Sequence, residues 1–181
     1  MSNTLLLASD VHGSIDALTL LEQRAREHHA ESILIAGDLC PSGHTHFQIL
    51  LRNIPQLFLV RGNCDSSYDF SNAGIPLPPQ KRRIDWQGRT IFMTHGDRIH
   101  SPFGQNLKPG DIFISGHTHT PKLQRGEDGV IWVNPGSTTY PRTPLGPTFA
   151  LLDEEGISIR SLTDDQPIAG LQYHFLPSAD Q

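Results

Sequence analysis

The segment TLLLASDVHGS, residues 4–14, contains a strand and a loop from which much of the rest can be inferred. Its apolar run, Thr4 to Ala8, is bounded by polar residues and has the length of a buried strand. Asp10, His12 and Gly13 follow directly. Because alternate side chains of an extended chain point the same way, Asp10 and His12 could present two ligands to one place.

The next segments predict a β-α-β-α-β order. Ser14 can cap a helix whose apolar residues recur every three or four positions until about His28, and a shorter helix is expected at 47–54. Strands are expected at 32–36 and 56–60. This order predicts parallel pairing, and ligands of such sheets lie beyond the carboxyl ends of the strands.

Antiparallel additions are expected after Gly74. Hairpins are predicted at 82–86 with 89–93 and at 148–153 with 157–162, and single strands at 111–115 and 130–133. The segment 164–181 is ambiguous, with one last strand expected at 171–176. The chain of 181 residues shows no linker or repeat, so we expect a single α/β domain over 1–181 with an uncertain tail from about 164.

Composition excludes several classes of protein. The formal net charge is −5, with 14 Lys and Arg against 19 Asp and Glu, so a general binder of nucleic acid or of anionic membranes is not expected. No apolar run approaches the length that spans a bilayer. Two cysteines, Cys40 and Cys64, cannot form a disulfide framework, which predicts a reduced cytoplasmic protein.

Polar residues of metal-binding type follow five predicted strands. These motifs are Asp10-x-His12, Gly37-Asp38, Gly62-Asn63-Cys64-Asp65, His95-Gly96-Asp97 and Gly116-His117-Thr118-His119. Each motif alone has an ordinary explanation as a solvated loop, but all five together do not. A mixed nitrogen and oxygen set of this size exceeds one ion and suits two transition metals bridged by a carboxylate.

With these motifs the sequence resembles the calcineurin-like metallophosphoesterases over nearly its whole length. The segments 9–14, 61–65 and 134–137 are most similar to the small bacterial YfcE-like phosphodiesterase group, which also includes the eukaryotic retromer scaffold subunit. The resemblance implies a four-layer αββα sandwich, in which two mixed sheets are flanked by helices, with a dinuclear site at the strand ends.

The resemblance also implies a ligand set and a reaction. Asp10, His12, Asp38 and His119 would hold one ion, and Asp38 would bridge to a second ion completed by Asn63, His95 and His117. Manganese is the preferred metal, with iron, zinc or nickel as alternatives. A hydroxide shared by the two ions would attack a small phosphodiester, with Asp38, Asn63 and His95 as the catalytic residues.

Two positions depart from the family pattern. Many members have histidine where this chain has Cys64, and a thiol is a poorer acid for the leaving group, which favours phosphodiesters over alkyl monoesters. Cys64 could equally be a small core residue. Near relatives have histidine where this chain has Asp97, whose carboxylate could orient His95 or repel an anionic substrate. His44 and His46 are further candidates for substrate contact. Nearby Arg98 and His100 could offer compensating positive charge, although each is expected to be solvated surface.

Three alternatives to a phosphodiesterase stay open. The retromer relatives suggest a catalytically weak scaffold that binds partner proteins, although all seven ligand positions are filled here by competent side chains. A phosphomonoesterase and a nuclease are the others, and the net charge and the 7% of aromatic residues disfavour a nuclease. The expected partner is a small phosphodiester, with no membrane and no nucleic acid, and a homo-oligomer is left open.

Overall fold

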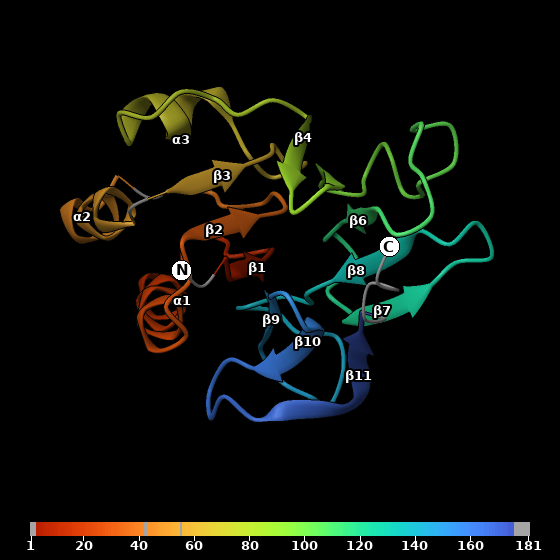
Figure 1. The fold of residues 1–181 in the computed structure, drawn as a ribbon. Helices are drawn as coiled ribbons and strands as arrows, with labels where there is room; N and C mark the ends of the chain where they lie inside the picture. The colour runs from red at the N-terminus through yellow and green to blue at the C-terminus, as the bar shows by residue number, and fades with distance from the viewer. Residues whose placement is uncertain (1–2, 42, 55, 176–181) are drawn as a thin grey trace.

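The computed structural model describes residues 3–41, 43–54 and 56–175, which form two sheets packed face to face (Figure 1). The first sheet has six strands in the order β11-β10-β9-β1-β2-β3. Their bounds are β1 Leu5–Ala8, β2 Ser32–Ile35, β3 Leu57–Leu59, β9 Thr148–Leu152, β10 Gly156–Ser161 and β11 Pro167–His174. The strands β1, β2 and β3 are parallel, and β9 joins β1 in antiparallel pairing.

Two helices form the crossovers between the parallel strands: α1 is Ile15–Glu27 and α2 is Thr45–Asn53. Ser14 caps α1 by accepting a hydrogen bond from the Ala17 N–H, as the sequence predicts, and Leu18 and Leu21 are fully buried on its inner face. The chain then returns to the same end of the sheet before each strand. This connectivity brings the loops after β1, β2 and β3 to one edge.

The second sheet has five strands in the order β4-β5-β6-β8-β7. Their bounds are β4 Lys81–Trp86, β5 Arg89–Thr94, β6 Ile112–Ile114, β7 Lys122–Arg125 and β8 Ile131–Asn134. The β4–β5 hairpin turns at Gln87 and Gly88, whose φ angles of 50° and 74° meet the requirement of a tight two-residue turn. The strands β5, β6 and β8 are parallel, so their carboxyl ends also share one edge.

Strand β1 separates the two hydrophobic layers because its alternate side chains face opposite sides. Leu6 packs with the inner faces of α1 and α2, whereas Leu5 and Leu7 face the second sheet. The inter-sheet layer also contains Met93 and Ile114. Every side chain of β1 is therefore buried, which explains why its sequence is continuously apolar.

The expected α/β fold of two mixed sheets with helices is confirmed, but the outer helical layer expected on the second sheet is not found among the described residues. The described helices lie on the six-stranded sheet, away from the second sheet (Figure 1). On the outer face of the second sheet, Phe92 and Phe113 are covered by the loop residues Ile99 and Leu107. No helix among the described residues is long and apolar enough to cross a membrane.

The structure contains two elements that the sequence patterns did not indicate and extends a third. Helix α3, Ser67–Asn72, has one buried residue, and strand β7 is mostly exposed. Neither element therefore shows the regular spacing of apolar residues by which a helix or strand is predicted. Strand β11 begins at Pro167, four residues before the predicted strand, and the predicted end at Leu176 lies outside the described residues.

Candidate metal centre

The loops after β1, β2, β3, β5 and β6 meet where the carboxyl ends of the parallel strands of both sheets come together. All seven predicted ligands lie in these loops. Asp10 and His12 follow β1, and Asp38 follows β2. Asn63 follows β3, His95 follows β5, and His117 and His119 follow β6. Residues that are more than a hundred positions apart in the chain are thus brought into contact.

The backbone is left-handed at five of these positions. The φ angles are 56° at Asp10, 47° at His12, 52° at Asp38, 66° at His117 and 58° at His119. A non-glycine residue in this region is strained, and such strain persists only where the surroundings hold it. The Asp10 and His12 N–H groups donate to the carbonyls of Gly37 and Asp38 at 3.1 and 2.9 Å, which ties the first two loops together.

Asp10, His12 and His119 form the first cluster of ligand-type atoms. Oδ1 of Asp10 lies 3.2 Å from Nε2 of His119 and 3.9 Å from Nε2 of His12. Among the described residues, Asp10 Oδ1 and His12 Nε2 are buried and have no hydrogen-bond partner. Two buried polar atoms that converge without a partner are the arrangement that a bound cation would satisfy.

Asp38 lies between the first cluster and a second one. Its Oδ2 is 3.8 Å from Nε2 of His12 and 3.4 Å from Nε2 of His95, and its Oδ1 accepts a hydrogen bond from the Cys64 N–H at 2.8 Å. Burial opposes ionisation, but His95 and the Cys64 N–H outweigh it and lower the pKa of Asp38 to about 2. The carboxylate is therefore ionised at neutral pH and available to both clusters.

Asn63, His95 and His117 form the second cluster. The Asn63 Oδ1 lies 3.1 Å from Nε2 of His95 and 2.9 Å from Nδ1 of His117. Burial disfavours the imidazolium form of His95, but Asp38 and the Ala36 carbonyl raise its pKa to about 9. The second cluster therefore combines amide oxygen and imidazole nitrogen atoms beside the Asp38 carboxylate.

Backbone carbonyls fix the orientation of two of the imidazole rings. Nδ1 of His95 donates to the Ala36 carbonyl at 2.8 Å, and Nδ1 of His119 donates to the Tyr140 carbonyl at 2.8 Å. In each ring the hydrogen bond at Nδ1 directs Nε2 toward a carboxylate. This is the usual way in which a protein orients a metal-binding histidine.

Asp65 holds the loop that carries Asp38, a role that the sequence did not indicate. Its carboxylate accepts hydrogen bonds from the N–H groups of Asp38 at 3.0 Å, Gly62 at 2.7 Å and Cys40 at 2.8 Å. A Cβ atom at Gly62 would collide with the Asp38 carboxylate, so this position requires glycine. The only sequence signal was the place of Asp65 directly after the Gly62-Asn63-Cys64 motif.

Two residues of the 134–137 segment support the other loops. The Ser137 hydroxyl donates to the Asp10 carbonyl at 3.0 Å, and the Asn134 amide donates to the Gly116 carbonyl at 2.8 Å. Asn134 also contacts Thr118 Oγ1 at 3.0 Å, between the two histidines of that motif. Both side chains thus bind the backbone of loops that carry predicted ligands.

The predicted substrate-contact residues have different surroundings. Cys64 is exposed and is not a core residue, and its sulfur accepts a hydrogen bond from the Asn63 amide at 3.2 Å. Desolvation of the sulfur and the Asp38 carboxylate raise the pKa of the Cys64 thiol to about 11. His44 and His46 are exposed at the start of α2, and neither contacts a predicted ligand among the described residues.

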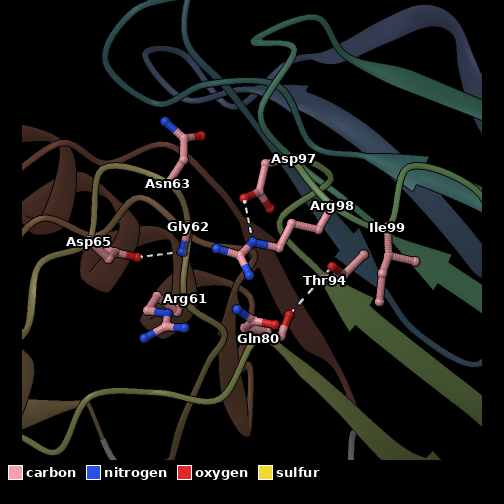
Figure 2. Close-up of a pocket in the computed structure, with 9 residues that line it drawn as sticks. All are labelled: Arg61, Gly62, Asn63, Asp65, Gln80, Thr94, Asp97, Arg98 and Ile99. Carbon is pink, nitrogen blue, oxygen red and sulfur yellow. Dashed lines mark hydrogen bonds and ion pairs between the residues drawn. The ribbon is translucent and has the colours of Figure 1, made fainter.

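A cavity of about 320 Å³ adjoins the second cluster at Asn63. Figure 2 shows Asp97 at its edge with the carboxylate directed at Arg98, 3.7 Å from Nε of that side chain. The His95 ring nitrogens instead face Ala36, Asn63 and Asp38, so Asp97 does not orient His95. Arg61, Gln80 and Arg98 are also part of the lining, a set that the sequence did not bring together.

Residues 4–156 match the family model of the calcineurin-like phosphoesterase superfamily domain. The chain is 29% identical over 177 residues to phosphodiesterase YfcE of Escherichia coli, and the match covers 91% of this chain and 95% of that protein. The solved structure of YfcE, described as a phosphoesterase, is similar with a TM-score of 0.82 at 26% identity. It covers 96% of this chain and 100% of YfcE.

A second kind of relative shares the fold. The structure of Vps29 from Entamoeba histolytica, solved in complex with zinc, is similar with a TM-score of 0.65 at 24% identity. The similarity covers 91% of this chain and 96% of Vps29. At this identity the likeness shows the fold alone.

Proposed function

Because the chain belongs to the calcineurin-like phosphoesterase superfamily, we propose that this phosphoesterase is a dimetal phosphodiesterase acting on small phosphodiesters. The observation that carries the proposal is the pair of buried, unpartnered atoms, Asp10 Oδ1 and His12 Nε2, within a ring of carboxylate, amide and imidazole donors. A buried polar atom without a partner costs about 1–3 kcal/mol, and a cation would remove that cost.

The donor chemistry supports two divalent ions. Asp10, His12, Asp38 and His119 would hold one ion, and Asn63, His95 and His117 would hold the second together with Asp38. Nitrogen with oxygen donors suits manganese, our preferred metal, and also iron, zinc or nickel. Such ions, when bound, lower the pKa of water and neutralise the charge that develops on phosphoryl oxygens.

The side chains of the two clusters hold the donor atoms in position, and Asp38 contributes a negative charge. The ionised Asp38 carboxylate, held by the Cys64 N–H, gives one negative charge to both clusters. His95 and His119 are turned by backbone carbonyls so that Nε2 faces the centre. Because Asp65 and Ser137 fix the loop backbones, the donor atoms are preorganised before substrate arrives.

The residue beside Asn63 favours diesters. A group that protonates the leaving oxygen works best with a pKa near the working pH, and the Cys64 thiol has a pKa of about 11. Esters with a poor, strongly basic leaving group therefore receive little help. We expect phosphodiesters with a phenolic or otherwise acidic leaving group to react faster than alkyl monoesters.

The test combines metal analysis with hydrolysis of bis(p-nitrophenyl) phosphate in the presence of Mn²⁺. We expect two ions per chain in the wild type and a loss of activity of about 100-fold or more in Asp38→Asn and His95→Ala. The matched control is Asp85→Asn, which changes an exposed carboxylate in β4 in the same way. Absence of bound metal, or equal turnover in all variants, would contradict the proposal.

One outcome would favour the scaffold alternative. A protein that binds both ions but releases no p-nitrophenol from diester or monoester would be a metal-binding scaffold rather than an enzyme.

A further inference from the structure

The cavity beside Asn63 contains two guanidinium groups from different parts of the fold. Arg61 follows β3 of the six-stranded sheet, and Arg98 follows β5 of the other sheet. Figure 2 shows the Arg98 side chain extending across the cavity toward Gly62, with Arg61 and Gln80 beside it. The two cationic side chains therefore approach each other from opposite walls.

A neutral group holds the two arginines together. In the orientation that satisfies its neighbours, the Gln80 amide oxygen accepts hydrogen bonds from Arg61 Nη2 at 3.0 Å and Arg98 Nη1 at 2.8 Å. Bringing two like charges to one acceptor is unfavourable unless an anion is shared between them. An amide oxygen orients both guanidinium groups without neutralising either one.

Two carboxylates, Asp65 and Asp97, line the cavity together with the two arginines, but neither forms a close hydrogen bond with a guanidinium group. Asp65 is occupied by three backbone N–H groups. Asp97 lies 3.7 Å from Nε of Arg98, longer than a good charge-assisted hydrogen bond. Among the described residues no carboxylate forms an ion pair with Arg61.

We propose that Arg61 and Arg98 bind a second oxyanion of the substrate, so that the preferred phosphodiester carries a phosphate or carboxylate on one of its alcohols. Guanidinium groups bind both oxyanions through paired N–H donors. This inference rests on the proposed function, because it places the reacting phosphodiester at the centre to which Asn63 belongs. It specifies the class of substrate, namely phosphodiesters that carry a second anionic group.

The place and size of the cavity support this class. Asn63 both lines the cavity and contacts His95 and His117, so the cavity opens directly from the second cluster. Figure 2 shows the Asn63 side chain turned away from the arginines. A volume of about 320 Å³ exceeds that of one oxyanion and accommodates a connecting group such as a sugar ring.

The experiment compares three p-nitrophenyl esters of thymidine 5′-phosphate with Mn²⁺ present: one with a free 3′-hydroxyl, one with a 3′-phosphate and one with a 3′-O-carboxymethyl group. We expect the wild type to prefer the anionic esters by about ten- to hundredfold in kcat/KM. The two anionic esters distinguish phosphate from carboxylate. Arg61→Gln and Arg98→Gln should each reduce the preference, mainly through KM, and Arg61→Lys should restore part of it.

Two further variants sharpen the result. Asp97→Asn removes the negative charge at the edge of the cavity and should strengthen the preference. Arg26→Gln changes an exposed arginine of α1 that forms an ion pair with Glu22, and it should leave the preference as in the wild type.

Failure of the two proposals can be told apart. If the wild type hydrolyses none of the esters, the proposed function is wrong. If it hydrolyses all three without preference, or if the arginine variants slow all three equally, the phosphodiesterase stands and the second-oxyanion site is wrong. Equal slowing would mean that the arginines contact the reacting phosphate itself.

Discussion

Oδ1 of Asp10 lies 3.2 Å from Nε2 of His119, and this contact connects the two sheets of the sandwich. Asp10 follows β1 in the six-stranded sheet, and His119 follows β6 in the five-stranded sheet. A cation held by both residues would therefore be a link between the sheets. Ligands that bind only the native state stabilise it by their binding free energy.

Metal binding should raise the melting temperature. At a free metal concentration of about 100 times Kd, one site adds about 2.7 kcal/mol, which corresponds to a rise in Tm of about 5–10 °C for a chain of this size. Thermal denaturation with Mn²⁺, followed by chelation, measures the effect. The rise should be lost in Asp10→Asn and kept in Asp85→Asn, and an equal rise in both variants would refute the assignment of Asp10.

Replacing Asp65 should destabilise the protein and impair the centre from a distance. In Asp65→Asn one acceptor oxygen becomes an amide NH2 donor that faces a backbone N–H donor, so we expect a loss of about 2–3 kcal/mol in the free energy of unfolding. Urea denaturation of the metal-free protein measures it. A change below about 0.5 kcal/mol would show that the three hydrogen bonds do not hold the loop.

The Cys64 position should control the preference between diesters and monoesters. Cys64→His supplies an imidazole, whose ordinary pKa is nearer to neutral than that of the thiol, so activity on an alkyl monoester should rise relative to bis(p-nitrophenyl) phosphate. Cys64→Ser is the control, since it changes size little and adds no such acid. An unchanged ratio in Cys64→His would contradict our account of the leaving group.

Stability should fall in acid through Asp165, which joins α1 to the β10–β11 turn. Burial disfavours its carboxylate, but hydrogen bonds from Arg160 at 2.7 Å and His28 at 2.8 Å outweigh this and lower its pKa. A carboxylate with a lowered folded-state pKa contributes stability above its unfolded value of about 4 and loses it as the pH falls through the folded value.

Asp165→Asn tests this contribution. We expect the variant to lose on the order of 1 kcal/mol at pH 7, because the group is partly exposed, and to approach the wild type near pH 3. Asparagine tolerates the positive φ of 59° at this position, so the backbone should not be strained further. Urea denaturation at several pH values measures the difference, and a gap that stays constant with pH would contradict the prediction.

Local patterns in the sequence predicted the elements that place the centre. The three- to four-residue spacing of apolar side chains and a capping serine predicted α1. Polar residues directly after each of five strands predicted which side chains would lie close together. These signals are short-range, and the parallel connection rule then brings the strand ends together. The β4–β5 hairpin was equally visible because Gln87 and Gly88 form a recognisable turn.

Other features depend on tertiary contacts that leave no local pattern. Arg61 and Arg98 are in loops of different sheets and line one cavity, although the Arg98 side chain is mostly exposed, in line with the expected solvated surface. Asp65 and Ser137 bind backbone groups, which any sequence supplies. Strand β7 is polar and mostly exposed, so only its pairing with β8 defines it.

The left-handed backbone at five predicted ligands lowers the stability of the metal-free protein at positions that the proposed activity requires. Each such residue costs about 1–3 kcal/mol in the metal-free protein, and glycine adopts the same conformation without that cost. His117→Gly should therefore melt at a higher temperature than the wild type when metal is absent, although it has lost a donor. Directed evolution for heat resistance alone, without metal or substrate, would therefore favour replacement of these predicted ligands.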